Sequence, residues 1–268
     1  MLSDQFLFEH IIRPFIYVGG GIMATWNPWH GCRKIGPGCL NCYVYRRDAE
    51  FGKDSSIIAR TSRFDLPVKR NRKGIYKLQT DEGTVYTCMT SDFFVEEADE
   101  WRPEAWRMIR ERGDLHFVII TKRIHRFQVG LPNDWGEGYD NVTICCTCEN
   151  QNRADYRLPI FLNLPIRHRT LIHEPMLEQI EIRRYLATGL IEQVTCGGES
   201  GPEARICDYA WILDTMQQCV EYDVPFWFKQ TGAKFKKGNR IYHIERKDQM
   251  NQAEKAGVNY RYERNIIK

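Results

Sequence analysis

Three cysteines in a short loop are the residues whose types and spacing most clearly suggest chemistry. Cys32, Cys39 and Cys42 follow the pattern C-x6-C-x2-C within TWNPWHGCRKIGPGCLNCY, whose glycines let the backbone wrap closely around a bound group. A disulfide would leave one thiol over, and structural zinc needs four ligands, for which His30 is the candidate fourth. A four-iron four-sulfur cluster on three cysteines keeps one iron open for a small molecule. The residues alone leave zinc and an iron–sulfur cluster equally open.

The remaining cysteines are interpreted as core residues. Cys145, Cys146 and Cys148 lie in an apolar, strand-like run, in which successive side chains point to opposite faces. Cys145 and Cys148 should therefore diverge, which makes this second C-x2-C a poor ligand pair. Free cysteine is a common small core residue, and the same interpretation applies to Cys88, Cys196, Cys207 and Cys219.

An alternation of apolar runs and helix-like stretches must position the cysteine loop. Each β-branched run ends in a polar cluster and is followed by apolar residues at helical spacing. The runs are a first strand near 22–27, then 84–89, 116–121, 141–148, 169–172, 191–196 and 224–228. This alternation predicts an α/β fold with a parallel sheet buried on both faces. The number of runs favours a partial or closed (β/α) barrel of about six to seven parallel strands over an open doubly wound sheet.

One barrel domain is predicted over residues 23–235, with an irregular insertion at 53–83. Residues 1–22 are predicted to be an N-terminal extension, and residues 236–268 a C-terminal appendage because the strand–helix alternation stops there. The basic run 69–73 in the insertion is interpreted as solvated or as a phosphate-contacting flap over the barrel mouth.

Composition and charge limit the function classes. The 268 residues carry a formal net charge of +3, far from the signature of a dedicated nucleic-acid binder. No apolar run is long enough to span a membrane, and the N-terminus lacks the features of a signal peptide. We therefore expect a cytoplasmic protein with no membrane partner and with reduced thiols. In such a protein, cysteines are expected to bind a metal or cluster rather than to form disulfides.

Two later strand ends add candidate catalytic groups. His173 and Glu174 end one run and are a candidate acid/base pair, or a strand end that Pro175 stops. Residues 197–201 form a glycine-rich strand-to-helix turn with Glu199 as its charged group, suited to an anion or simply to a tight turn. Because parallel strands converge at their carboxyl ends, we expect these residues to face the cysteine loop.

The joint pattern of motifs resembles a known family. The chain contains the motifs TWNPWHGCRKIGPGCLNCY, CMTSDFF, ITKR, CEN, HEPML, CGGESGPEAR and VPFWFKQTG. Their order and spacing resemble those of a phage-associated family of unknown function with a three-cysteine motif. The likeness covers nearly all of residues 23–235. That family resembles radical S-adenosylmethionine enzymes, and its cysteine loop is similar to that of the radical lyases that repair spore photoproducts in DNA.

The resemblance implies a 4Fe-4S cluster on Cys32, Cys39 and Cys42, after the first strand of a partial barrel. S-adenosylmethionine would chelate the open iron, and an external electron donor would drive its cleavage to a 5′-deoxyadenosyl radical that removes hydrogen from the substrate. The first cysteine gap is longer than is usual in that superfamily. Asn41 replaces the usual aromatic residue, so Tyr43 is the candidate adenine contact.

Polar residues at the ends of the second to fourth predicted strands, nearest the cysteine loop in a barrel ordered by sequence, are the candidate S-adenosylmethionine pocket. Their chemistry suits a zwitterionic amino acid joined to a ribose. The residues are Ser91, Asp92, Lys122, Glu149 and Asn150. The alternative is that some of them, especially Asp92 and Asn150, cap the helices that follow.

Functions from different classes remain at this point. The leading prediction is a radical S-adenosylmethionine enzyme of unknown substrate, for which the phage association suggests nucleic acid or a nucleotide. One alternative is a zinc- or cluster-stabilised module that binds nucleic acid or protein without catalysis. Another is a cofactor-independent hydrolase or transferase that uses His173 and Glu174.

Overall fold

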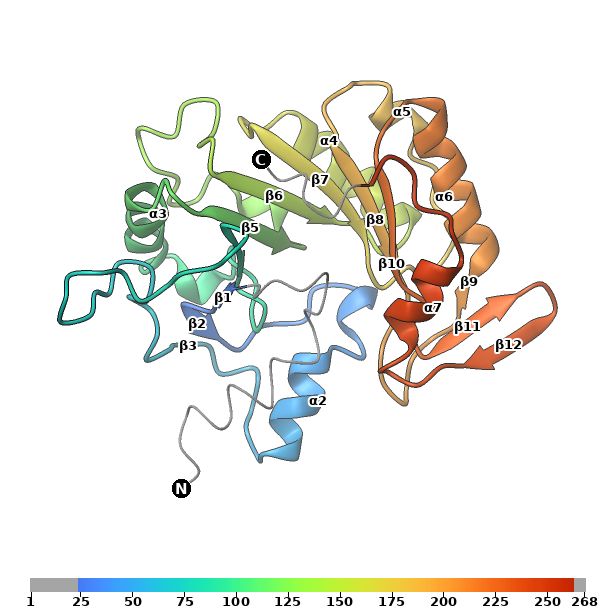
Figure 1. Ribbon diagram of the computed structural model, residues 1–268, viewed down its shortest axis with the longest axis horizontal. Helices are drawn as coiled ribbons and strands as arrows, with labels where there is room; N and C mark the ends of the chain where they lie inside the picture. The colour runs from blue at the N-terminus through green and yellow to red at the C-terminus, as the bar shows by residue number, and fades with distance from the viewer. Residues whose placement is uncertain (1–23, 263–268) are drawn as a thin grey trace.

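A computed structural model describes residues 24–262, so the predicted extension 1–22 lies outside the described residues. Parallel strands form a single sheet in the order β1-β4-β5-β6-β7-β8-β10, and the sheet curls into a half-barrel (Figure 1). The strands are β1 (Ala24–Trp26), β4 (Thr84–Thr87), β5 (His116–Thr121), β6 (Val142–Thr147), β7 (His168–His173), β8 (Gln193–Gly197) and β10 (Phe226–Gln230). Every predicted run contributes a strand, and the α/β partial barrel is confirmed.

Helices connect most of the successive strands, as a parallel sheet requires. They are α3 (Arg102–Glu111), α4 (Gln151–Leu162), α5 (Arg183–Leu186) and α6 (Tyr209–Glu221), with the short 3-10 turns η2 (Glu96–Ala98) and η3 (Ile124–Arg126). Two more helices, α2 (Tyr43–Glu50) and α7 (Gln249–Lys255), lie at the end of the half-barrel where the strands have their carboxyl ends (Figure 1). None of the helices within residues 24–262 is long and apolar enough to cross a membrane.

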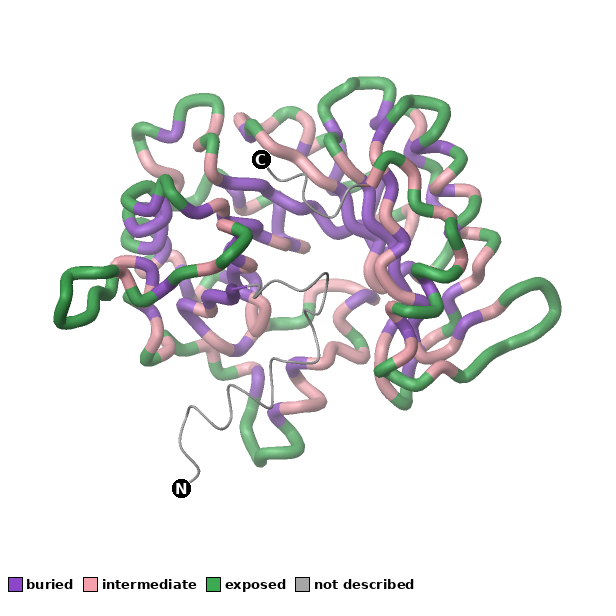
Figure 2. Tube along the Cα trace, in the orientation of Figure 1, coloured by how far each residue is buried: buried purple, intermediate pink, exposed green. Residues whose placement is uncertain are grey.

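The two faces of the sheet pack against different side chains. In β5, Phe117 and Ile119 belong to the large core shared with the helices, whereas Val118 joins Cys145 and Ile172 in a small cluster on the inner face. This division follows from the alternation of side chains along a strand. Figure 2 shows the central strands as largely buried, which explains their nearly continuous apolar runs.

Two small sheets flank the half-barrel. The first pairs β2 (Trp29–His30) with β3 (Ala59–Arg60), which ties the start of the cysteine loop to the segment 53–83. The second contains β9 (Cys207–Asp208), β11 (Lys234–Lys237) and β12 (Arg240–His243).

Residues beyond 236 contact the half-barrel. Helix α7 packs against β10, and Tyr260 pairs with Phe226 at the edge of that strand. The boundaries 23–235 and 236–268 stay predictions, but the C-terminal segment is in direct contact with the sheet.

Candidate functional site

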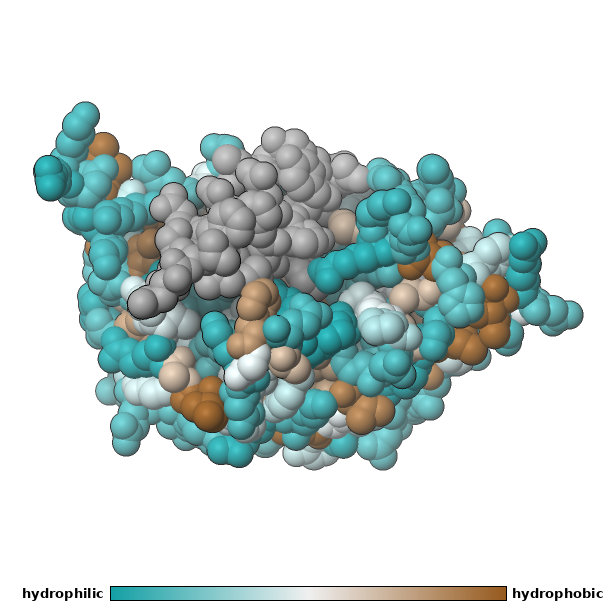
Figure 3. All heavy atoms as spheres, turned by 90° about the horizontal axis from the view of Figure 1, so that it is seen from below, coloured by the Kyte–Doolittle hydropathy of each residue, from teal (hydrophilic) through white to brown (hydrophobic). Residues whose placement is uncertain are grey.

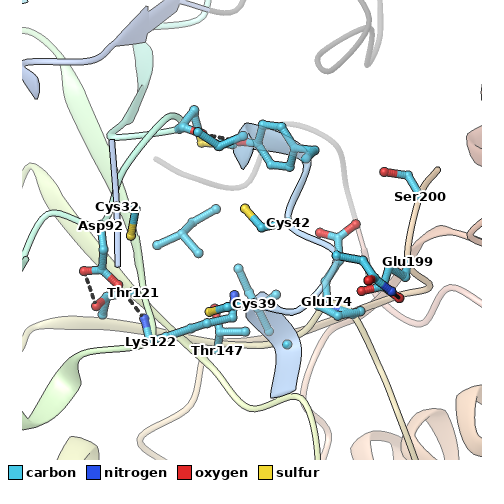
Figure 4. Close-up of a pocket in the computed structure, with 18 of the residues that line it drawn as sticks. Cys32, Cys39, Cys42, Asp92, Thr121, Lys122, Thr147, Glu174, Glu199 and Ser200 are labelled. Atoms are coloured by element: carbon cyan, nitrogen blue, oxygen red, sulfur yellow. Dashed lines mark hydrogen bonds between the residues drawn. The ribbon is translucent and has the colours of Figure 1, made fainter. Parts of the chain in front are cut away.

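The predicted cysteines line one cavity at the carboxyl ends of the parallel strands. Cys32, Cys39 and Cys42 are each partly buried, and their side chains face the same space (Figure 4). The cavity has a volume of about 230 Å³. Polar residues from the ends of β4, β5, β6, β7, β8 and β10 complete its lining, among them Ser91, Asp92, Lys122, Thr147, Glu174, Glu199 and Lys229.

Local contacts fix the loop that carries the cysteines. Gly31 has a φ of +91°, and a Cβ at this position would lie 2.4 Å from the Ile57 carbonyl oxygen, so the turn toward Cys32 requires glycine. The Cys32 amide then donates a hydrogen bond to the Ser55 carbonyl at 2.7 Å. The 3-10 turn η1 (Pro37–Cys39) leads on to α2, which begins directly after Cys42.

His30, the candidate fourth zinc ligand, has a different partner. Its Nε2 lies 2.8 Å from Oδ2 of Asp48, and His30 does not line the cavity. Within residues 24–262, no three His, Cys, Asp or Glu side chains lie close enough together to share one metal ion. The metal or cluster therefore stays a prediction.

Glu149 contacts the cysteine loop at Gly38 and does not line the cavity. Its buried carboxylate accepts hydrogen bonds from the Gly38 amide at 3.2 Å and from Arg157 Nη1 at 2.5 Å. A Cβ on Gly38 would lie 3.0 Å from the Glu149 carboxyl carbon, so the loop packs directly on this side chain. Burial raises the pKa of Glu149, but the positive charges of Arg157 and Lys122 outweigh it and the net shift is downward. Glu149 therefore stays ionised and positions the middle of the loop.

Arg123 is a site residue that our sequence analysis did not assign. This buried guanidinium lies 3.6 Å from Cys32 Sγ and donates to the Arg33 carbonyl at 2.7 Å. Burial and the nearby Asp92 carboxylate raise the pKa of Cys32 to about 12, and the charge of Arg123 opposes them. The signal for Arg123 was its place directly after Lys122, at a strand end that points to the loop.

Ser91, Asp92 and Tyr43 line the cavity but use their oxygen atoms within the protein. Asp92 accepts hydrogen bonds from Thr121 Oγ1 at 2.8 Å and from the Lys122 amide at 2.9 Å. The Ser91 hydroxyl donates to the Gly31 carbonyl, and the Tyr43 hydroxyl donates to a backbone carbonyl. These residues thereby connect the end of β4 to the cysteine loop and to α2.

Lys122 and Asn150 occupy different positions although both were assigned to one ligand. Lys122 lines the cavity, and its ammonium group makes no hydrogen bond to a residue in the described part of the chain. Asn150 lies outside the lining, where its side chain accepts a hydrogen bond from the Arg153 amide at 3.0 Å and caps α4. The structure thus favours the helix-cap interpretation for Asn150.

The structure does not bring His173 and Glu174 together. Side-chain alternation along β7 places His173 on the face opposite Ile172, where it is fully buried and outside the cavity. Its Nδ1 lies 2.5 Å from the Cys148 carbonyl oxygen and must donate, so the proton sits on Nδ1, and burial lowers the pKa of His173 to about 4. Glu174 instead lines the cavity and accepts a hydrogen bond from Lys229 at 2.7 Å.

Glu199 also lines the cavity and is tied to neighbouring chain segments. It accepts hydrogen bonds from Arg205 Nη2 at 2.6 Å and from Asn41 Nδ2 at 3.0 Å. Asn41 immediately precedes Cys42, so Glu199 joins the turn at 197–201 to the cysteine loop. Burial raises the pKa of Glu199, but its hydrogen bonds with Arg205 outweigh this and the net shift is downward.

The C-terminal segment contributes residues that sequence patterns gave no reason to select. Arg246 and Met250 line the cavity although they lie beyond the last strand of the sheet. No motif or periodicity marks them, because their position depends on how α7 packs against β10. The basic run 69–73 does not line the cavity.

These features define the class of protein: a parallel α/β half-barrel with a three-cysteine pocket at the carboxyl ends of its strands. The family model described as "Protein of unknown function (DUF5131)" matches residues 22–262, and the chain belongs to this family. Comparisons with curated proteins and with solved structures gave no match. The family match includes the segment beyond 235 that supplies Arg246 and Met250.

Proposed function

We propose that the protein is a radical S-adenosylmethionine enzyme, which cleaves S-adenosylmethionine reductively and removes hydrogen from a substrate. The observation that carries this proposal is that Cys32, Cys39 and Cys42, from one loop, face a single cavity at the carboxyl ends of a parallel half-barrel. Thiols arranged around an open cavity suit a cluster that keeps one iron free. The architecture is also the one that the sequence resemblance implies.

In this proposal the cysteine thiolates hold a 4Fe-4S cluster. When bound, the cluster supplies the electron that starts the cleavage of S-adenosylmethionine. Arg123 lies 3.6 Å from Cys32 Sγ, and its positive charge favours the thiolate form that a ligand requires. Glu149 holds the middle of the loop through the Gly38 amide, so the sulfur atoms of Cys39 and Cys42 stay directed at the cavity.

Lys122 is the best-placed residue for the carboxylate of S-adenosylmethionine. Its ammonium group is in the cavity without a hydrogen-bond partner among residues 24–262. Ser91, Asp92 and Tyr43 form the adjoining wall and fix the Lys122 backbone and α2 relative to the cysteines. Their role is to shape the pocket in which Lys122 binds the ligand.

Glu174 and Glu199 are the proposed groups that face the substrate. They follow the neighbouring strands β7 and β8 and both line the cavity. Lys229 donates a hydrogen bond to Glu174, and Arg205 keeps the pKa of Glu199 below its usual value. Carboxylate oxygens of both residues accept hydrogen bonds from a substrate in this proposal. His173 has no part in this step because it faces the other side of the sheet.

The test is to purify the protein without oxygen and measure its iron, sulfide and zinc. We expect about four irons per chain and a brown colour. S-adenosylmethionine and a chemical reductant should then give 5′-deoxyadenosine and methionine, detected by mass spectrometry. Cys39→Ala, prepared in parallel, should give neither iron nor products. Zinc in place of iron, with no cleavage, would overturn the proposal in favour of a zinc-stabilised binding module.

A further inference from the structure

Arginines from two distant parts of the sequence lie at the mouth of the cavity. Arg46 and Arg47 are on α2, the helix that begins directly after Cys42. Arg246 lines the cavity from the segment that precedes α7. Figure 1 shows α2 and α7 at the same end of the half-barrel, and Figure 3 shows a largely hydrophilic surface on this side of the molecule.

Contacts place Arg46 at the edge of the cavity. Its Nη1 donates to the carbonyl of Ser200, a residue of the cavity lining, at 3.3 Å. The next residue, Gly201, has a φ of +104°, and a Cβ there would lie 2.2 Å from Arg46 Nη1. The glycine-rich turn at 197–201 therefore leaves room for a guanidinium group.

The guanidinium group of Arg246 lies close enough to Arg46 and Arg47 to be affected by their positive charges. Burial and then the positive charges of Arg46 and Arg47 lower the pKa of Arg246. Burial also lowers the pKa of Arg47, against the opposing charges of Asp48 and Glu50. Like charges held together at a cavity mouth are stabilised when an anion binds between them.

The carboxylates of the cavity do not neutralise this cluster because each has a cation of its own. Asp92 lies 3.6 Å from Arg123, Glu174 lies 2.7 Å from Lys229, and Glu199 lies 2.6 Å from Arg205. On α2, the buried Asp48 is bonded to His30 and Ser55. None of these carboxylates is therefore the ion-pair partner of Arg46 or Arg47.

We infer that Arg46, Arg47 and Arg246 bind a phosphate group of the substrate, and that the substrate is a phosphate ester whose other end reaches into the cysteine cavity. Guanidinium groups bind phosphate through paired, charge-assisted hydrogen bonds, which suits an arginine cluster better than lysines would. The inference rests on the proposed function only in taking the cysteine cavity as the reaction site. A free nucleotide and a single-stranded nucleic acid share this phosphate chemistry.

The test measures binding of a fluorescein-labelled single-stranded DNA oligonucleotide by fluorescence anisotropy between about 50 and about 200 mM salt. The variant R46Q/R47Q/R246Q, called the rim variant, is compared with K69Q/R72Q/K73Q, the control variant. The control variant removes the same number of positive charges from the insertion. That control segment is exposed, does not line the cavity and belongs to the turquoise loop on the side of Figure 1 away from α7. Melting temperature and iron content are measured for every protein.

We expect the rim variant to bind about 100-fold more weakly at about 0.1 M salt and to lose about 2 from the slope of log affinity against log salt. This follows because each phosphate contact with a single strand contributes about 0.7 to the slope. The control variant should bind as the wild type does. Thymidine 5′-monophosphate, but not thymidine, should compete with the probe if the substrate is a free nucleotide, and neither should compete effectively if it is a polymer.

Equal binding by the rim variant and the wild type, with equal melting temperatures, would overturn the inference, as would failure of the wild type to bind either phosphate probe. These outcomes are separable from failure of the proposed function. If the protein loads iron and cleaves S-adenosylmethionine but shows no arginine-dependent binding, only the proposed phosphate site is contradicted. If binding depends on the arginines but the protein holds no iron, only the proposed radical reaction is contradicted.

Discussion

The chain contains the pattern C-x2-C twice, and the two copies have different environments. Cys39 and Cys42 lie in a loop that turns through η1, and both line the cavity. Cys145 and Cys148 belong to β6 and the residue after it, where Cys145 packs in the inner cluster and Cys148 in the outer core. The same spacing therefore gives convergent or divergent thiols, according to whether the backbone turns or stays extended.

The two regions also touch each other, and the contact gives them complementary roles. Gly38 in the loop donates a hydrogen bond to Glu149, which directly follows Cys148. The loop thus presents thiols to the cavity, while the end of β6 supplies a rigid, charged support. The predictions below test this division, beginning with the largest expected effect.

Replacing Cys32, Cys39 or Cys42 by alanine should abolish iron binding. Each thiolate is an expected ligand, and a 4Fe-4S cluster is held by cysteine thiolates. Iron and sulfide analysis of anaerobically prepared protein, with its visible absorbance, gives the measurement. Cys145→Ala is the matched control from the strand copy and should keep full iron content. Loss of iron in Cys145→Ala, or its retention in any loop variant, would contradict the comparison.

Glu149→Gln should lower the free energy of unfolding by about 3–5 kcal/mol, because it leaves the buried guanidinium of Arg157 without its partner. Urea denaturation of the iron-free protein measures this loss. Asp155→Asn is the control on α4, the helix that carries Arg157; it breaks an exposed ion pair with Arg184 of α5 and should lower the free energy of unfolding by at most about 1 kcal/mol. Similar losses in the two variants would show that Glu149 does not support the loop as described.

Stability should fall as the pH is lowered from about 6.5 to 4, in part because of His173. Its folded pKa is about 4, below the ordinary value of 6.5, so the unfolded chain binds the proton first and the stabilisation is lost as pH falls through this window. The full contribution is about 3 kcal/mol. His173→Gln should flatten the profile of unfolding free energy against pH, whereas His243→Gln, at an exposed position, should not. Parallel profiles for all three proteins would refute the assignment.

Asn150→Ala should lower the free energy of unfolding by about 1 kcal/mol through loss of the α4 cap. S-adenosylmethionine affinity, measured by calorimetric titration of cluster-loaded protein, should stay the same. Lys122→Ala should instead weaken binding with little change in stability, because its ammonium group lies in the cavity without a partner in the described chain. Weaker binding of S-adenosylmethionine by Asn150→Ala would instead show that Asn150 contacts the ligand.

Much of the fold could be predicted because its signals are local. Runs such as HFVIIT and NVTICCTC are long enough to identify strands, and their alternation with helices predicts a parallel sheet. Convergence of strand ends then brings Ser91, Asp92 and Lys122 to the cysteine loop. His173 was assigned to the site from its place at a strand end, but a shift of one residue along a strand changes the face, and only the neighbouring Glu174 reaches the cavity.

The sequence by itself determined the parallel α/β architecture and the loop with its three closely spaced thiols. These depend on periodicity, glycine positions and spacing within short segments, which local chain geometry controls. Only the tertiary structure decided that Glu149 supports the loop, that Arg123 contacts Cys32 and that Arg246 joins the cavity. These contacts join residues about 90 or more positions apart, and they form only when the sheet curls and α7 packs against β10.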